Sequence, residues 1–169
     1  AQVIARCEKI GFMRKILWLV ACLCLPCMAQ EVTGNLSSES ITAKGYRPGR
    51  IEHIVLFKYR RDVSDQTRRQ VADRFLGLKN QCVRNGAPYI ASIVTGAPNS
   101  LEGLDGGFDQ GFIVSFNSEG DRNYYVGTPV IKDPHLFDAK HDEFKHFVKP
   151  LLLTGPEGVL VFDFRVQDN

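Results

Sequence analysis

The segment IEHIVLFKY, residues 51–59, decides the fold of this chain. It is rich in β-branched and aromatic residues and is too short for a helix, so it predicts a β-strand. Successive side chains of a strand point to opposite faces, so Ile54 and Leu56 lie on one face and Val55 and Phe57 on the other. Because both sets are apolar, we expect both faces of the resulting sheet to be covered.

The rest of the domain predicts three more strands and two main helices. Ser64 is a suitable N-cap for a helix from about Asp65 to Val83, and a second main helix is expected from Phe137 to Leu152. A short helix capped by Ser118 is expected to end at Tyr125. The further strands are expected over residues 89–95, 108–116 and 159–166. The order β-α-β-β-α-β predicts an α+β fold with the ferredoxin-like arrangement.

The later strands repeat the two-sided apolar pattern. One side of the third strand holds Phe112, Val114 and Phe116, and the other holds Ile113 and Ser115. In the last strand one side holds Leu160, Phe162, Phe164 and Val166, and the other holds Val159 and Val161. Two helices cover only one face, and leaving the other face in water would forgo roughly 25 cal/mol for each Å² of apolar surface. We therefore expect a homodimer whose sheets cover one another, the alternative being a monomer with scattered exposed aliphatic residues.

The start of the chain has the pattern of an export signal. Met13-Arg14-Lys15 precedes the apolar run of residues 16–25, and Cys27-Met28-Ala29 supplies small residues at a cleavage site near Ala29. We expect residues 1–12 to be an upstream extension without function, residues 13–29 a signal peptide, and the mature protein to be periplasmic or secreted. A buried N-terminal helix and acylation of Cys22 or Cys27 are the alternatives. Residues 30–50, rich in Ser, Thr and Gly, predict a flexible linker before a domain at residues 51–166.

The composition argues against several kinds of partner. Residues 1–29 hold four of the 21 basic and one of the 19 acidic residues, which leaves 17 basic and 18 acidic residues in the remainder. This balance does not favour nucleic-acid binding, and no apolar run reaches the ~18 residues of a membrane span, so no stable membrane anchor is expected. Four of the five cysteines precede residue 30, so the mature chain keeps Cys82 alone and no internal disulfide.

The sequence holds no pattern for a metal or a cofactor, and we expect neither. His141 and His146 are five residues apart, about 140° around a helix, so their side chains diverge. The glycine-rich loop at residues 96–107 lacks the Lys-Ser/Thr ending of a phosphate-binding loop.

Several segments, taken in order, resemble one known family. They are residues 52–59, Gly107-Phe108-Asp109, residues 115–119, Tyr124-Tyr125, residues 138–152 and the closing Val161-Phe162-Asp163-Phe164. Together they resemble the stress-responsive A/B barrel family, also called Dabb, over residues 51–166. The resemblance implies a dimeric α+β barrel built from ferredoxin-like subunits.

The resemblance also implies candidate catalytic residues. In one branch, the olivetolic acid cyclases, a histidine base and a tyrosine close a polyketide by aldol condensation. By position, His141 corresponds to that base, Tyr125 to the tyrosine and His53 to a pocket histidine, whereas Gln110 stands where a further pocket histidine would fall. From the residues themselves, Asp138 three positions before His141 would form a carboxylate–imidazole pair. The alternatives are a solvated helix face for His141, a structural role for His53 and simple packing for Tyr125.

Three functional hypotheses follow from these residues. The leading one is an exported, stress-associated barrel-domain protein that holds a small apolar molecule without catalysing a reaction. The second is a cyclase or lyase acting on a carbonyl compound, with His141 as base and with Tyr125 and His53 polarising the substrate oxygen. The third is a structural protein whose dimer is its function. Whether the protein is an enzyme stays open at this point.

Overall fold

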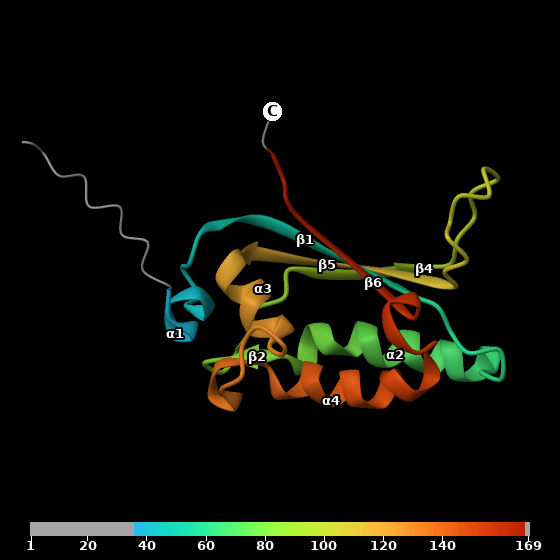
Figure 1. Cartoon of the computed structure of the whole chain (residues 1–169). Helices are drawn as coiled ribbons and strands as arrows, with labels where there is room; N and C mark the ends of the chain where they lie inside the picture. Colours follow the sequence, from blue (N-terminus) through green and yellow to red (C-terminus); the bar gives the residue numbers. More distant parts are fainter. Residues whose placement is uncertain (1–35, 168–169) are drawn as a thin grey trace, which may run out of the picture. The chain divides into compact units, whose positions relative to one another are not determined.

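The computed structural model describes residues 36–167, which form an antiparallel sheet with two long helices packed on one of its faces (Figure 1). The expected upstream extension and signal peptide, residues 1–29, lie outside the described residues. The sheet order is β4-β5-β1-β6, and this α+β architecture confirms the ferredoxin-like prediction. Its strands are β1 (Pro48–Phe57), β4 (Ser92–Gly96), β5 (Gln110–Ser118) and β6 (Val159–Arg165).

The helices begin where serine and aspartate side chains cap them. The helices are α1 (Ser38–Thr42), α2 (Asp65–Gln81), α3 (Glu119–Val126) and α4 (Ala139–Val148). Ser64 Oγ accepts a hydrogen bond from Thr67 N at 3.2 Å, and Ser118 Oγ accepts one from Asp121 N at 3.0 Å. The short elements are strands β2 (Val83–Arg84) and β3 (Ala87–Pro88) and the 3₁₀ helices η1 (Pro134–Leu136), η2 (Lys149–Leu151) and η3 (Gly155–Glu157).

The two faces of the sheet differ as the strand pattern predicts. On the face toward α2 and α4, Phe75 of α2 stacks on Phe112 of β5 with ring centroids 4.0 Å apart. On the opposite face, Val94 and Phe162 are 55% and 58% exposed. The side chains that share this open face are Ile54, Leu56, Val94, Ile113, Leu160, Phe162 and Phe164. An apolar face of this size has no cover within residues 36–167.

The prediction of a flexible linker over residues 30–50 is wrong from Leu36 onward. Ser37 caps α1, Thr42 is 1% exposed, and β1 begins at Pro48. Asn123 of α3 donates a hydrogen bond to the carbonyl of Ile41 at 2.7 Å. The sequence did not predict this segment because α1 is too short for a helical apolar period and is held mainly by polar contacts to α3.

Two further sequence expectations concern the core and the membrane. Cys82 is buried and unpaired, and burial raises the pKa of its thiol, which makes it a small core residue. Within the part of the chain that the structure describes, no helix is both long and apolar enough to cross a membrane.

Candidate functional site

A cavity of about 370 Å³ lies on the helix side of the sheet, between β1, β6 and α4. Most of its wall is apolar and comes from Val55, Phe57, Phe75, Phe144, Val148 and Val161. Its polar lining residues are His53, Asp163, His141, Thr128, Lys145 and Lys149. An apolar cavity with a few polar groups is the usual form of a small-molecule site.

His141 is a buried, neutral hydrogen-bond acceptor at one wall of this cavity. Its Nδ1 lies 2.6 Å from the carbonyl oxygen of Tyr125. A carbonyl can only accept, so Nδ1 carries the proton and Nε2 keeps a lone pair that bonds to no described residue. Burial, helped by the charges of Lys145 and His53, lowers the pKa of His141 to about 3 against the opposing effect of the Tyr125 carbonyl.

Asp138 caps α4 and does not pair with the His141 ring. Its Oδ1 accepts hydrogen bonds from Lys140 N at 2.8 Å and His141 N at 3.1 Å. Its Oδ2 accepts a bond from the hydroxyl of Tyr89 at 2.8 Å. The spacing of three residues therefore brings this carboxylate to the backbone of His141, because the N-cap position directs it at the free N–H groups of the first turn.

Tyr125 lies against His141 but does not line the cavity. Its ring stacks on the His141 ring at 3.7 Å and meets the His53 ring edge-on at 5.8 Å. The residue is 1% exposed, and its hydroxyl has no hydrogen-bond partner among residues 36–167. Burial holds the pKa of this hydroxyl well above its usual value. The structure thus brings the three predicted site residues together, with Tyr125 behind the two histidines.

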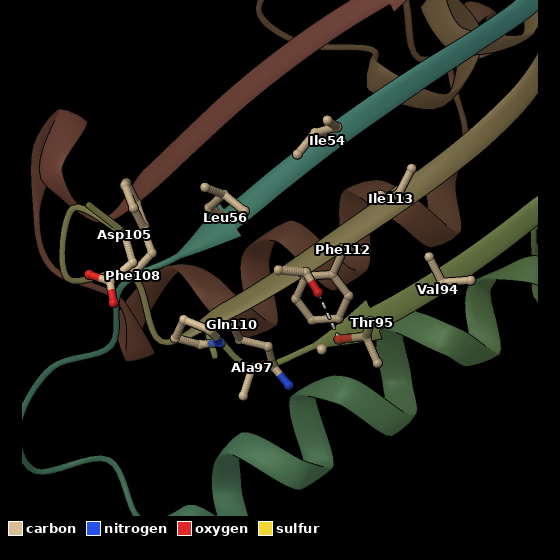
Figure 2. Close-up of a pocket in the computed structure, with 13 residues that line it drawn as sticks. Ile54, Leu56, Val94, Thr95, Ala97, Asp105, Phe108, Gln110, Phe112 and Ile113 are labelled. Carbon is tan, nitrogen blue, oxygen red and sulfur yellow. Dashed lines mark hydrogen bonds between the residues drawn. The ribbon is translucent and has the colours of Figure 1, made fainter. Parts of the chain in front are cut away.

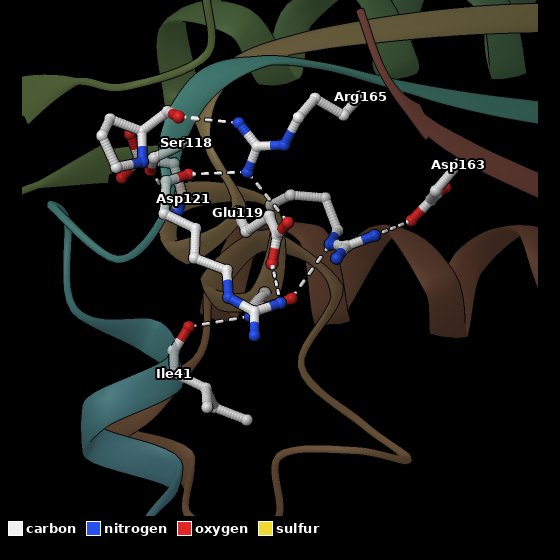
Figure 3. A network of polar contacts seen from close by, with 10 residues as sticks. Ile41, Ser118, Glu119, Asp121, Asp163 and Arg165 are labelled. Atoms are coloured by element: carbon white, nitrogen blue, oxygen red, sulfur yellow. Dashed lines mark hydrogen bonds and ion pairs between the residues drawn. The ribbon is translucent and has the colours of Figure 1, made fainter. Parts of the chain in front are cut away.

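A carboxylate–imidazole pair does exist, between His53 and Asp163. The two residues are register partners on β1 and β6, and His53 Nδ1 lies 2.7 Å from Asp163 Oδ1. Arg122 of α3 forms an ion pair with the other oxygen of Asp163 (Figure 3). Burial acts to raise the pKa of Asp163, but the bonds from His53 and Arg122 outweigh it and lower the pKa. The carboxylate accepts a hydrogen bond from Nδ1 of His53, so this ring nitrogen carries a proton.

Sequence reasoning missed Asp163 and Arg122. Asp163 continues the strand phase of Val159 and Val161, which placed it on the helix side of the sheet. No local signal shows that it faces His53, because 110 residues separate the two. Only the register of β6 against β1 makes them neighbours.

The described part of the chain offers no ready site for a metal ion. Within residues 36–167 there is no group of three or more His, Cys, Asp or Glu side chains that could hold one. His146 is exposed on the side of α4 away from the buried His141.

The open face of the sheet carries a second hollow, of about 440 Å³ (Figure 2). Gly96 and Gly111 are register partners at its floor, where two side chains are missing. Ile54, Leu56 and Val94 are among the apolar residues around it. A Cβ atom added to Gly96 would meet no atom within 4 Å, so this position is open.

Comparisons with known proteins agree with this fold. The family model of the Stress Responsive A/B Barrel Domain matches residues 51–166. An Arabidopsis thaliana protein is 20% identical with a TM-score of 0.55, covering 70% of this chain and 97% of its own. A hydroxynitrile lyase from Passiflora edulis is 18% identical with a TM-score of 0.56, covering 72% and 97%. A protein from Jannaschia sp. CCS1, described as a dimeric ferredoxin-like protein of unknown function, is 17% identical with a TM-score of 0.54, covering 70% and 100%.

At these identities the likeness to solved structures shows the fold alone. No curated protein matches the chain.

Proposed function

The chain belongs to the stress responsive A/B barrel domain family, and on this premise we propose that it is a homodimeric barrel protein that holds a small, mostly apolar molecule. The observation that supports a bound ligand is the cavity of about 370 Å³ between β1, β6 and α4. Export stays part of the proposal, supported by the pattern of residues 13–29.

The polar groups of the cavity favour a ligand that carries a hydroxyl. Neutral His141 offers Nε2 as an acceptor, because its Nδ1 proton is held by the Tyr125 carbonyl. The apolar walls favour an aromatic or aliphatic body, and a hydroxyl would satisfy the free acceptor. A carbonyl compound, as expected for a cyclase, would instead need a donor, which the cavity offers only in the side chains of Thr128, Lys145 and Lys149.

We expect 4-ethylphenol to bind the cavity about fivefold to tenfold more tightly than ethylbenzene, because one buried hydrogen bond contributes roughly 1 kcal/mol. Chemical-shift titration of the ¹³C-labelled methyl groups of Val55 and Val148 measures both affinities. His141→Phe should remove the preference for the phenol while keeping a ring against Tyr125. His146→Phe is the matched control, since His146 is exposed on the same helix.

Failure of the wild-type protein to bind either compound at millimolar concentration would refute the proposed ligand. Equal affinity for the two compounds would refute the acceptor role of His141.

A cyclase or lyase activity is the second candidate, and the His53–Asp163 pair favours it. A carboxylate that fixes the tautomer of a histidine at a cavity wall is an arrangement suited to proton abstraction. His141 is the weaker candidate for the base, because a pKa of about 3 makes it a poor proton acceptor near neutral pH. In this candidate the base is His53, and Tyr125 supports His141 without contacting the substrate.

The homodimer is supported by the complementary shape of the open face. Across the sheet, one row of register partners is Val94, Ile113, Ile54 and Phe162, all apolar. The next row is Gly96, Gly111, Leu56 and Leu160, so the face is hollow at β4 and bulky at β6. A two-fold axis parallel to the strands would place β6 of each copy over β4 of the other, so that bulky residues meet the hollow.

We expect Gly96→Val to weaken the dimer at least about tenfold, because the new side chain occupies the hollow that the second copy fills. The monomer should keep its fold, since nothing lies within 4 Å of the added Cβ and valine favours a strand. Sedimentation velocity over a concentration series measures the dissociation constant.

Gly45→Val is the control, because Gly45 is also unobstructed and lies outside the sheet. An unchanged dissociation constant for Gly96→Val would exclude the hollow from the interface. A wild-type protein that stays monomeric at the highest concentration would overturn the dimer itself.

A further inference from the structure

We infer that residues 36–47, which precede the matched family domain at 51–166, form a clamp on α3 that positions both cavity histidines. The effect of the clamp on function rests on the ligand site proposed above. Its structural basis is a chain of contacts from α1 through α3 to His141 and His53.

The first link is between α3 and the two histidines. The carbonyl of Tyr125 accepts a hydrogen bond from Nδ1 of His141. The Tyr125 ring stacks on the same imidazole, with ring centroids 3.7 Å apart. One turn earlier in α3, Arg122 forms an ion pair with Asp163. The Asp163 carboxylate in turn accepts a hydrogen bond from Nδ1 of His53. A shift of α3 would therefore disturb the Nδ1 contacts of both histidines together.

The second link is between the clamp and the N-terminal half of α3. The backbone N–H of Gly120 donates to the Tyr46 carbonyl at 3.1 Å, and that of Glu119 donates to the Arg47 carbonyl at 3.2 Å. A Cβ atom at Gly120 would lie 1.9 Å from the carbonyl oxygen of Ala43, so the contact requires glycine. These bonds satisfy N–H groups in the first turn of α3 that have no partner within the helix.

Asn123 joins the two links directly. Its Nδ2 donates to the Ile41 carbonyl at 2.7 Å, and its Oδ1 accepts from Arg122 Nε at 2.9 Å. Figure 3 shows this path of polar contacts from Ile41 of α1 to Asp163 of β6. The clamp thus reaches His53 through side chains as well as through the backbone of α3.

Arg84 also connects the clamp to α3. Arg84 donates one hydrogen bond to the Thr42 carbonyl and another to Asp121 Oδ1 at 3.2 Å. Thr42 itself is buried. Positions on both α1 and α3 are therefore held by the same guanidinium, which fixes the distance between the two helices.

The imidazole nitrogens of the full chain, labelled with ¹⁵N-histidine, test the clamp without any ligand. Long-range ¹H–¹⁵N spectra at pH 7.5 should show the Nδ1–H tautomer for His141 and a proton on Nδ1 of His53 in the wild type. In Gly120→Ala the added Cβ prevents the Ala43 carbonyl from approaching α3. We expect both histidines to lose this Nδ1 signature and 4-ethylphenol to bind about fivefold to tenfold more weakly, with the circular dichroism of the folded protein unchanged.

Gly45→Ala is the matched control, because it makes the same change in the clamp where no atom lies within 4 Å. If Gly120→Ala fails to fold, Asn123→Ala removes only the two side-chain bonds and should still change the Nδ1 signal of His53. Folded variants whose histidine signals match the wild type would overturn the inference and leave the clamp a purely stabilising segment. Because these spectra need no ligand, a wild type that binds no phenol would refute the proposed function without deciding the clamp.

Discussion

Replacing Asp138 by alanine is expected to lower the free energy of unfolding by about 3 kcal/mol. The substitution removes the cap of α4, which costs roughly 1 kcal/mol, and leaves the buried Tyr89 hydroxyl unsatisfied, which costs about 1–3 kcal/mol more. Both partners are buried, since Asp138 is 3% and Tyr89 6% exposed. Urea unfolding at fixed protein concentration measures the difference.

The variant Asp138→Asn keeps a capping side chain but removes the negative charge near His141. It therefore separates the capping role of Asp138 from an electrostatic effect of its carboxylate on His141. Asparagine caps helices as well as aspartate, and its amide can donate to the Tyr89 oxygen, so we expect a loss below about 1 kcal/mol. The capping explanation would be wrong if the alanine variant were as stable as the asparagine variant.

Lowering the pH from 6.5 to 4.5 is expected to destabilise the fold by about 2–3 kcal/mol through His141. Its pKa is about 3 in the folded protein and its ordinary value is 6.5, so below pH 6.5 the unfolded chain binds a proton that the folded chain rejects. Each pH unit in this window costs up to about 1.4 kcal/mol, and the loss levels off near pH 3, where the folded form also takes up the proton. The stability is therefore present above pH 6.5 and is lost as the pH falls.

The variant His141→Gln should remove this dependence of the unfolding free energy on pH, and His146→Gln should keep it. Lys145 and His53 are the charged or titratable groups that add to the shift, and both remain in the two variants. The partners of Asp163 and Glu119 lower the pKa values of these carboxylates. Their protonation also lowers the free energy of unfolding as the pH falls, but only at a lower pH than for His141. Urea unfolding at pH 6.5, 5.5 and 4.5 tests the point, and equal slopes in wild type and His141→Gln would contradict it.

The sequence by itself determined the order of the four sheet strands and of α2, α3 and α4, the helix caps at Ser64 and Ser118, and the two-sided apolar sheet. These features follow from patterns within ten to twenty neighbouring residues, since strand alternation, helix period and capping are local. The two-sided strands also led to the homodimer proposed here, because an apolar open face follows from alternation alone.

Only the tertiary structure decided which polar groups meet. His53 pairs with Asp163 because β6 lies antiparallel to β1 in one particular register, and a slip of one residue would turn the carboxylate to the other face. Tyr125 became a support because the end of α3 packs against α4, which brings the Tyr125 carbonyl to Nδ1 of His141. The clamp of residues 36–47 is held by contacts with residues some 40 to 120 positions away, and long-range polar contacts of this kind leave no periodic trace in a sequence.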